Sequence, residues 1–155
     1  MEPLEGVLIE MGQLFHIILY IFAGAVLLSV SLQDMKTGRI ADWKNLMLLG
    51  LGIADSFCVR EPEIAWRFAG LFCVSGFFFL VALMTGGGIG GGDVKLMAAA
   101  GFLLGVRKIM FAATVGIMLA GVCSLILLSA GKKGRKDVFA LGPFLCIGIL
   151  LGMLN

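Results

Sequence analysis

Long apolar runs separated by short polar segments dominate the sequence. Five of these runs are clear, and they cover about residues 12–33, 45–59, 66–85, 109–130 and 138–154. A helix needs about 20 residues to cross ~30 Å of hydrocarbon, and the runs at 45–59 and 138–154 are shorter than that. The pattern predicts helices that are surrounded by lipid.

A sixth apolar piece, residues 94–106, lies between a glycine-rich segment and the pair Arg107-Lys108. It covers only about 20 Å at 1.5 Å per residue. We interpret it as a short fourth helix that starts below the membrane surface, preceded by a loop at membrane depth. Such a loop is tolerated only where protein covers it or where it lines a wet cavity. The sequence therefore predicts an all-α membrane protein, a single domain (residues 1–155) with a polytopic bundle of about six transmembrane helices.

Composition agrees with this class. Of the 155 residues, 60% are hydrophobic and 14% are charged, whereas a soluble domain is roughly half apolar. The net charge of +2 is too small to indicate nucleic-acid binding, so lipid is the expected surrounding and nucleic acid is not an expected partner. Four cysteines lie in apolar runs without a CxxC pair, and we expect them to pack as small hydrophobic residues: Cys58, Cys73, Cys123 and Cys146.

The basic residues predict an orientation. With the N-terminus outside, the inner loops hold Lys36, Arg39, Lys44, Lys95, Lys132, Lys133, Arg135 and Lys136, and the outer segments hold Arg60, Arg67, Arg107 and Lys108. Cytoplasmic loops carry the excess of Lys and Arg, and residues 131–137 provide most of this bias. The N-terminus is acidic and lacks the basic region of a cleaved signal peptide.

Two aspartates are predicted to share one membrane face. Asp34 is at the inner end of the first apolar run. Asp93 is at the inner start of the predicted fourth helix, after glycines at positions 86–88 and 90–92. Two spans lie between them, and an even number of crossings returns the chain to the same side. Ionisable groups near hydrocarbon are costly, so they indicate function by default.

Two neighbouring carboxylates provide acid–base chemistry without a metal or cofactor. They cannot both ionise easily, so the pair shares a proton. The ionised member can take a proton from a water that attacks a peptide carbonyl, and the protonated member can donate to the carbonyl oxygen. A structural alternative carries similar weight from physics alone: Asp34 would end a helix at the interface, and Asp93 would cap one.

Three motifs resemble the type IV prepilin peptidase family of GxGD intramembrane proteases. Residues 90–96 read Gly-Gly-Gly-Asp-Val-Lys-Leu, and residues 34–40 read Asp-Met-Lys-Thr-Gly-Arg-Ile. Residues 142–145 read Gly-Pro-Phe-Leu, like the family's Gly-Pro-Phe segment. The resemblance covers about residues 15–152. One departure is Ala41, where the family often has proline, which should relax the loop without removing chemistry.

The resemblance implies a membrane-bound aspartic endopeptidase with Asp34 and Asp93 as catalytic residues. It also implies a substrate-binding or loop role for Gly90, Gly92, Lys95, Gly142 and Pro143. The implied substrates are type IV pilin-like precursors, which lose a short basic leader near the cytosolic face of the bacterial inner membrane. The loop after Asp34 is too short for the extra methylating domain of bifunctional members, so the resemblance is to the compact peptidase-only form.

Other residues have simpler interpretations. We expect Lys36 and Lys95 to act mainly as surface anchors, and Asp42 to cap the second helix. Asp55 is expected to bond a neighbouring helix or face water, and His16 to be interfacial or to pack. Two pairs spaced for helix packing are Gly101 with Gly105 and Gly148 with Gly152. Two other functions remain open: another GxGD intramembrane protease, or a small transporter in which the aspartates relay protons or cations.

Overall fold

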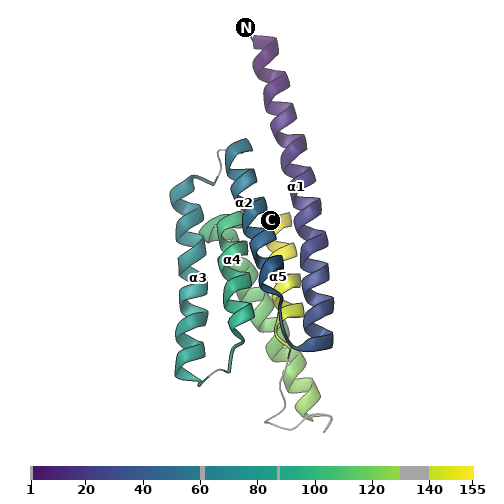
Figure 1. Ribbon diagram of the computed structural model, residues 1–155, viewed down its shortest axis with the longest axis vertical. Helices are drawn as coiled ribbons and strands as arrows, with labels where there is room; N and C mark the ends of the chain where they lie inside the picture. Colours follow the sequence, from purple (N-terminus) through teal and green to yellow (C-terminus); the bar gives the residue numbers. More distant parts are fainter. Residues whose placement is uncertain (1, 60–61, 87, 130–139) are drawn as a thin grey trace.

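The computed structural model describes residues 2–59, 62–86, 88–129 and 140–155, except for the side chains of residues 2–9. These residues form five helices and no strand: α1 Glu2–Thr37, α2 Asp42–Cys58, α3 Ile64–Met84, α4 Gly91–Ser129 and α5 Gly142–Leu154 (Figure 1). The all-α prediction is confirmed. Gly87 and the basic segment 131–137 lie outside the described residues.

The expected count of six transmembrane helices is not confirmed: the described residues form five helices, and the predicted fourth and fifth helices lie on either side of a kink within one of them. This helix is α4, which is interrupted at Gly105, where φ is 75° and ψ is 169°. This conformation is not helical and is easy only for glycine, so a kink at Gly105 separates two helical parts of α4. The bend lies at the end of the predicted short helix 94–106.

In the described part of the chain, three helices have the length and composition to cross a membrane: Glu10–Thr37 within α1, α3 and α4. The other two are shorter, as their sequence runs predicted, with 17 residues in α2 and 13 in α5. At 1.5 Å per residue, α5 is about 20 Å long.

The central helix of the bundle is α4. It packs against α2, α3 and α5, while α1 packs against α2 and α5 (Figure 1). The first part of α1 extends beyond the other helices. The core between the helices is apolar, with fully buried side chains such as Leu27 on α1, Leu48 on α2, Phe78 on α3, Leu103 on α4 and Ile149 on α5.

Glycines allow the close approach of helices at two contacts. A Cβ on Gly70 of α3 would collide with the carbonyl oxygen of Gly101 on α4. A Cβ on Gly148 of α5 would collide with the carbonyl oxygen of Ala112, and one on Gly152 would lie 3.1 Å from the Ala112 Cβ. The expected small-residue packing is therefore confirmed for Gly101 and for Gly148 with Gly152, whereas Gly105 lies at the kink of α4 and faces Pro62.

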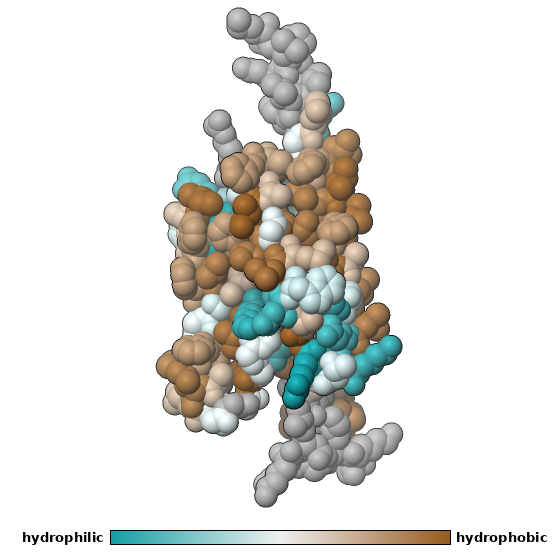
Figure 2. Space-filling view, in the orientation of Figure 1, coloured by the Kyte–Doolittle hydropathy of each residue, from teal (hydrophilic) through white to brown (hydrophobic). Residues whose placement is uncertain are grey.

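The outer surface is mostly apolar. Figure 2 shows brown side chains over most of the described surface, with hydrophilic residues gathered toward the end where α1 passes into α2. Exposed large side chains include Ile21 and Leu28 on α1, Phe72 on α3, and Met118 and Leu125 on α4. A contiguous surface of this kind is what a lipid environment requires, and it agrees with a membrane protein.

Candidate active site

The first aspartate, Asp34, lies in the last turn of α1. Its side chain is 6% exposed, although it is close to the end of the helix. The backbone N–H of Gly142, which opens α5, donates a 3.0 Å hydrogen bond to Asp34 Oδ2. Asp34 is therefore enclosed at the contact between α1 and α5 instead of pointing into solvent.

The second aspartate, Asp93, is in the first turn of α4 and is 8% exposed. Its backbone N–H donates to the carbonyl oxygen of Gly90 at 3.0 Å, and the N–H of Gly90 donates to the Asp93 carboxylate. This exchange resembles a capping box, so Asp93 does help to start the helix. Its Oδ1 atom is nevertheless buried without a hydrogen-bond partner among the described residues.

The two carboxylates belong to one site. Asp34 and Asp93 are close enough for their charges to interact, although they are 59 residues apart in sequence (93 − 34). The C-terminal end of α1 and the N-terminal ends of α4 and α5 meet at the same end of the bundle (Figure 1). Two buried, interacting carboxylates with one unpartnered oxygen form a suitable place for a shared proton and a water molecule.

Gly142 and Pro143 suit the start of α5 beside Asp34. A Cβ on Gly142 would lie 2.5 Å from Asp34 Oδ2 and 2.9 Å from Cγ, which is too close for any side chain. Pro143 is in the first turn, where no intrahelical partner for its missing N–H is needed. The Gly-Pro pair thus brings a backbone donor to the carboxylate and then continues as a helix.

Gly90 and Gly92 are restricted by space and not by backbone angle. Among the described glycines, only Gly38, Gly86 and Gly105 have positive φ, so Gly90 and Gly92 have backbone angles that other residues can adopt. A Cβ on Gly92 would instead lie 3.0 Å from the Ile40 Cβ, and one on Gly90 would lie 3.3 Å from Asp93 Oδ2.

Lys95 is occupied by an ion pair at the surface. Its Nζ donates to both carboxylate oxygens of Asp42, at 2.9 and 2.8 Å, and both side chains are more than half exposed. The expectation that Asp42 caps α2 is wrong. The cap position is Ala41, and no side chain caps this helix. The exposed pair links the first turn of α2 to the second turn of α4.

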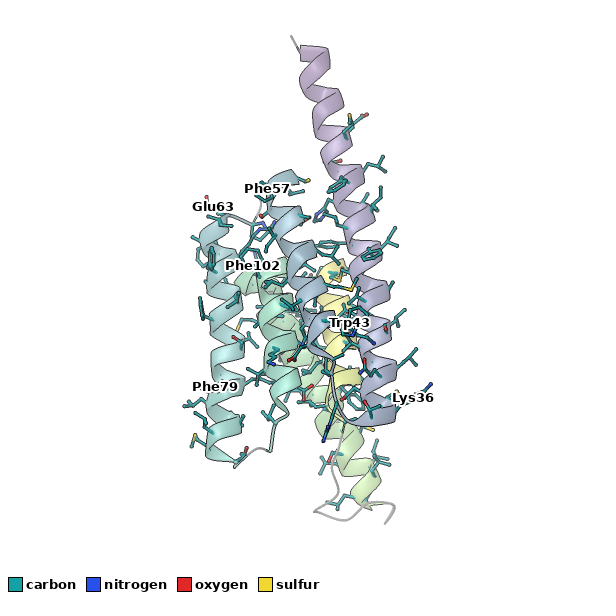
Figure 3. All side chains as sticks on the ribbon, in the orientation of Figure 1. Lys36, Trp43, Phe57, Glu63, Phe79 and Phe102 are labelled. Atoms are coloured by element: carbon teal, nitrogen blue, oxygen red, sulfur yellow. The ribbon has the colours of Figure 1, made fainter. Side chains whose placement is uncertain are left out.

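A second buried charged cluster lies away from the aspartate pair. Asp55 is fully buried and contacts Arg67 Nη2 at 2.9 Å and His16 Nδ1 at 2.5 Å. Arg67 also donates to the carbonyl oxygens of Pro62 and Leu103. Pro62 precedes Glu63, which Figure 3 labels at the end of the bundle opposite Lys36.

This cluster holds the bend of α4 in place. The break at Gly105 leaves carbonyl groups just before it without intrahelical donors, and Arg67 satisfies one of them at Leu103. The Asp55 carboxylate keeps the Arg67 guanidinium paired in the interior. The expectation that Asp55 bonds a neighbouring helix is confirmed, with partners on both α1 and α3.

Two residues near the aspartates were missed as site residues. Cys146, one turn after Gly142, is 2% exposed and lies within electrostatic reach of both Asp34 and Asp93. Asn45 on α2 is 5% exposed, and its Nδ2 donates a 3.4 Å hydrogen bond to the carbonyl oxygen of Gly92. Both residues lie in apolar runs. The sequence could have indicated Asn45 only as a polar residue one turn inside a helix.

In the described part of the chain, no group of three or more His, Cys, Asp or Glu residues lies close enough together to hold a metal ion. The candidate site itself contains two carboxylates and nearby backbone groups, and carboxylates can exchange protons with a water molecule.

Comparison with known proteins places these features in a family. Residues 21–125 match the model of the type IV leader peptidase family. The chain is 27% identical over 149 residues to a prepilin leader peptidase/N-methyltransferase of Bacillus subtilis. It is 30% identical over 129 residues to a protein of the same name from Burkholderia pseudomallei, and 29% over 125 residues to one from Legionella pneumophila.

These alignments cover most of this chain but much less of the relatives. They include 92%, 80% and 81% of the chain, and 59%, 42% and 40% of the Bacillus, Burkholderia and Legionella proteins. The family match contains both aspartates and ends before Gly142. No solved structure matches the chain significantly.

Proposed function

Because this chain belongs to the type IV leader peptidase family, we propose that it is a membrane-embedded aspartic endopeptidase that removes the leader from type IV prepilin-like precursors. Asp34 and Asp93 are the proposed catalytic residues. The observation that carries this assignment is their burial in one electrostatically coupled pair at the meeting point of α1, α4 and α5.

The proposed reaction is hydrolysis of one peptide bond. The ionised aspartate takes a proton from a water molecule while the water oxygen attacks the scissile carbonyl carbon, and the protonated aspartate donates its proton to the carbonyl oxygen. The tetrahedral intermediate then collapses: the newly protonated aspartate donates its proton to the leaving nitrogen, the C–N bond breaks, and the other aspartate takes back a proton from a hydroxyl group of the intermediate. One water is consumed, and the dyad returns to its original state with one proton.

Two hydrogen bonds support this use of the pair. The Gly142 N–H at Asp34 and the Gly90 N–H at Asp93 each occupy part of one carboxylate and fix its orientation. Asp93 Oδ1 stays free of protein donors among the described residues, so a water or a shared proton can bind there. Oriented carboxylates that need little rearrangement lower the barrier to proton transfer.

The location of the proposed reaction follows from the basic residues near the pair. Lys36, Arg39 and Lys95 lie near this end of the chain's helices, which favours a cytosolic position for the site and an outer N-terminus. We propose the bacterial inner membrane as the compartment. The proposal covers the peptidase alone, since only residues 38–41 separate α1 from α2 and no domain is inserted between them.

A purified-component assay tests the proposal. The protein in detergent or liposomes is incubated with a prepilin, and loss of the leader is followed by gel shift and by mass spectrometry of the new N-terminus. We expect a single cut before the apolar segment of the precursor. A protein that leaves prepilin intact but cleaves other membrane proteins would belong to a different kind of protease, and one that cleaves nothing but moves protons across liposomes would be a transporter.

A further inference from the structure

An apolar groove lies beside the aspartate pair, between α2, α3 and α4. Its volume is about 350 Å³, and its lining is mainly Leu46, Leu49, Leu71, Ala98 and Ala99. Its polar residues are Asn45 and the Asp42–Lys95 ion pair. Because Asp42 and Lys95 neutralise each other, the groove presents no net charge to a ligand.

Asn45 connects this groove to the catalytic pair. Its Nδ2 donates to the carbonyl oxygen of Gly92, the residue directly before Asp93. Of the described buried side-chain oxygen and nitrogen atoms, two have no hydrogen-bond partner, namely Asn45 Oδ1 and Asp93 Oδ1. Both therefore belong to residues in contact with the Gly92–Asp93 peptide unit.

The mechanism uses the free oxygen of Asp93 but leaves that of Asn45 unexplained. A buried acceptor without a donor costs free energy comparable to a lost hydrogen bond, so in a native protein a water molecule or a ligand supplies the donor. The bond to Gly92 uses the Nδ2 donor of Asn45 and so leaves its Oδ1 as the acceptor that remains. The missing partner is a donor that is neutral, because the surroundings are apolar.

We propose that Asn45 is a substrate-positioning residue, whose Oδ1 accepts a backbone N–H of the precursor while the precursor's apolar segment lies in this groove. The inference rests on the proposed function, and it names the binding site for the part of the substrate that follows the cut. A peptide backbone provides neutral N–H donors next to apolar side chains, which is the combination that the groove and its acceptor require.

The proposal has a structural consequence for the cut. A chain with its apolar segment against Leu46, Leu49 and Ala98 and one N–H on Asn45 passes the Gly92–Asp93 peptide as it leaves the groove. The bond presented to the aspartates is then set by its distance from the residue held by Asn45. Asn45 thereby fixes the register of cleavage without touching the reacting atoms.

The test is a double-mutant cycle between enzyme and substrate. Precursor peptides are made in which a single backbone N–H near the cleavage site is replaced by an ester oxygen, one position at a time. Each is processed by the wild-type enzyme, by Asn45→Ala and by Gly50→Ala, and kcat/KM is measured. Gly50 is on the same helix, and a Cβ there meets nothing within 4 Å, so this variant is the matched control.

We expect one ester position to lower kcat/KM about tenfold in the wild type and in Gly50→Ala, and to have little effect in Asn45→Ala, since the bond is already lost there. If no position has such an effect in the wild type, or if the loss is the same in Asn45→Ala, Asn45 does not bind the substrate backbone. A wild-type enzyme without any sensitive position refutes the proposal even if Asn45→Ala folds poorly. Absence of any cleavage of the all-amide precursor would instead refute the proposed function itself.

A second variant tests the groove. Ala98→Leu fills part of it, and we expect kcat/KM for the precursor to fall at least fivefold, mainly through KM, while Ala82→Leu on α3, which does not line the groove, leaves it unchanged. Unchanged processing by a stably folded Ala98→Leu protein would show that the apolar segment binds elsewhere.

Discussion

The backbone N–H of Gly142 donates a hydrogen bond to Oδ2 of Asp34 across a sequence separation of 108 residues. The contact joins the last turn of α1 to the first turn of α5 and fixes one carboxylate of the pair. A backbone donor is well suited to this task because it cannot rotate away as a side chain can. The contact is possible only because residue 142 has no side chain.

Gly142→Ala should therefore disturb Asp34 directly. The added methyl group would lie 2.5 Å from Oδ2, so either the carboxylate or the start of α5 has to move. We expect at least a tenfold loss of prepilin processing, because a displacement of about 1 Å at a reacting group has effects of that order or larger. Gly121→Ala on α4 is the control, since its Cβ meets nothing within 4 Å. Equal rates for both variants would mean that the Gly142 contact does not matter for activity.

Replacement of either aspartate tests the shared-proton mechanism. Asp34→Asn and Asp93→Asn each remove one member of the acid–base pair, and we expect processing to fall below detection in both. Glu63→Gln, an exposed carboxylate at the other end of the bundle, should retain full activity. Substantial turnover by either asparagine variant in the gel-shift assay would rule out a mechanism that needs both carboxylates.

The glycine segment before α4 offers a comparison between adjacent positions. A side chain at residue 92 would press on Ile40, whereas one at residue 91 meets nothing within 4 Å. Gly92→Val should reduce processing strongly, because Gly92 lies between Asn45 and Asp93, and Gly91→Val should have a much smaller effect. Thermal unfolding of the purified variants separates lost activity from lost stability. Normal cleavage by Gly92→Val would identify this segment as a simple linker.

The buried pair of Asp55 and Arg67 should contribute to stability more than to chemistry. Asp55→Ala leaves Arg67 buried without its counter-charge, and the loss of one partner of such a pair costs about 3–5 kcal/mol. The exposed pair of Asp42 and Lys95 provides the contrast, since Asp42→Ala should cost about 0–1 kcal/mol. Unfolding in detergent measures both. Equal stability of the two variants would contradict the role given to Asp55 at the bend of α4.

The sequence by itself determined the class of the protein and the approximate positions of its helices. Apolar runs and their lengths are local properties, and they predicted an all-α membrane bundle with a short helix ending near residue 106. Glycine at position 105 was part of that pattern, and a kink with non-helical angles at Gly105 separates the two predicted helices within α4. The sequence did not show that Arg67 bonds the Leu103 carbonyl beside this kink. Six helices were expected, and the described residues form five when the two parts of α4 are taken together.

Only the tertiary structure decided which polar groups meet. Span counting predicted that Asp34 and Asp93 share a membrane face, but their enclosure by Gly142 and Gly90 depends on how α1, α4 and α5 approach one another. The packing of the helices also decides which residues pair with Asp42 and Asp55, and it leaves Oδ1 of Asn45 without a donor among the described residues. Hydrophobic pattern specifies which segments leave water, because burial depends on the amount of apolar surface. Whether a hydrogen bond forms depends on differences of a few tenths of an ångström in the distance between its two atoms. These distances are fixed only when the glycines and side chains of all five helices are packed together.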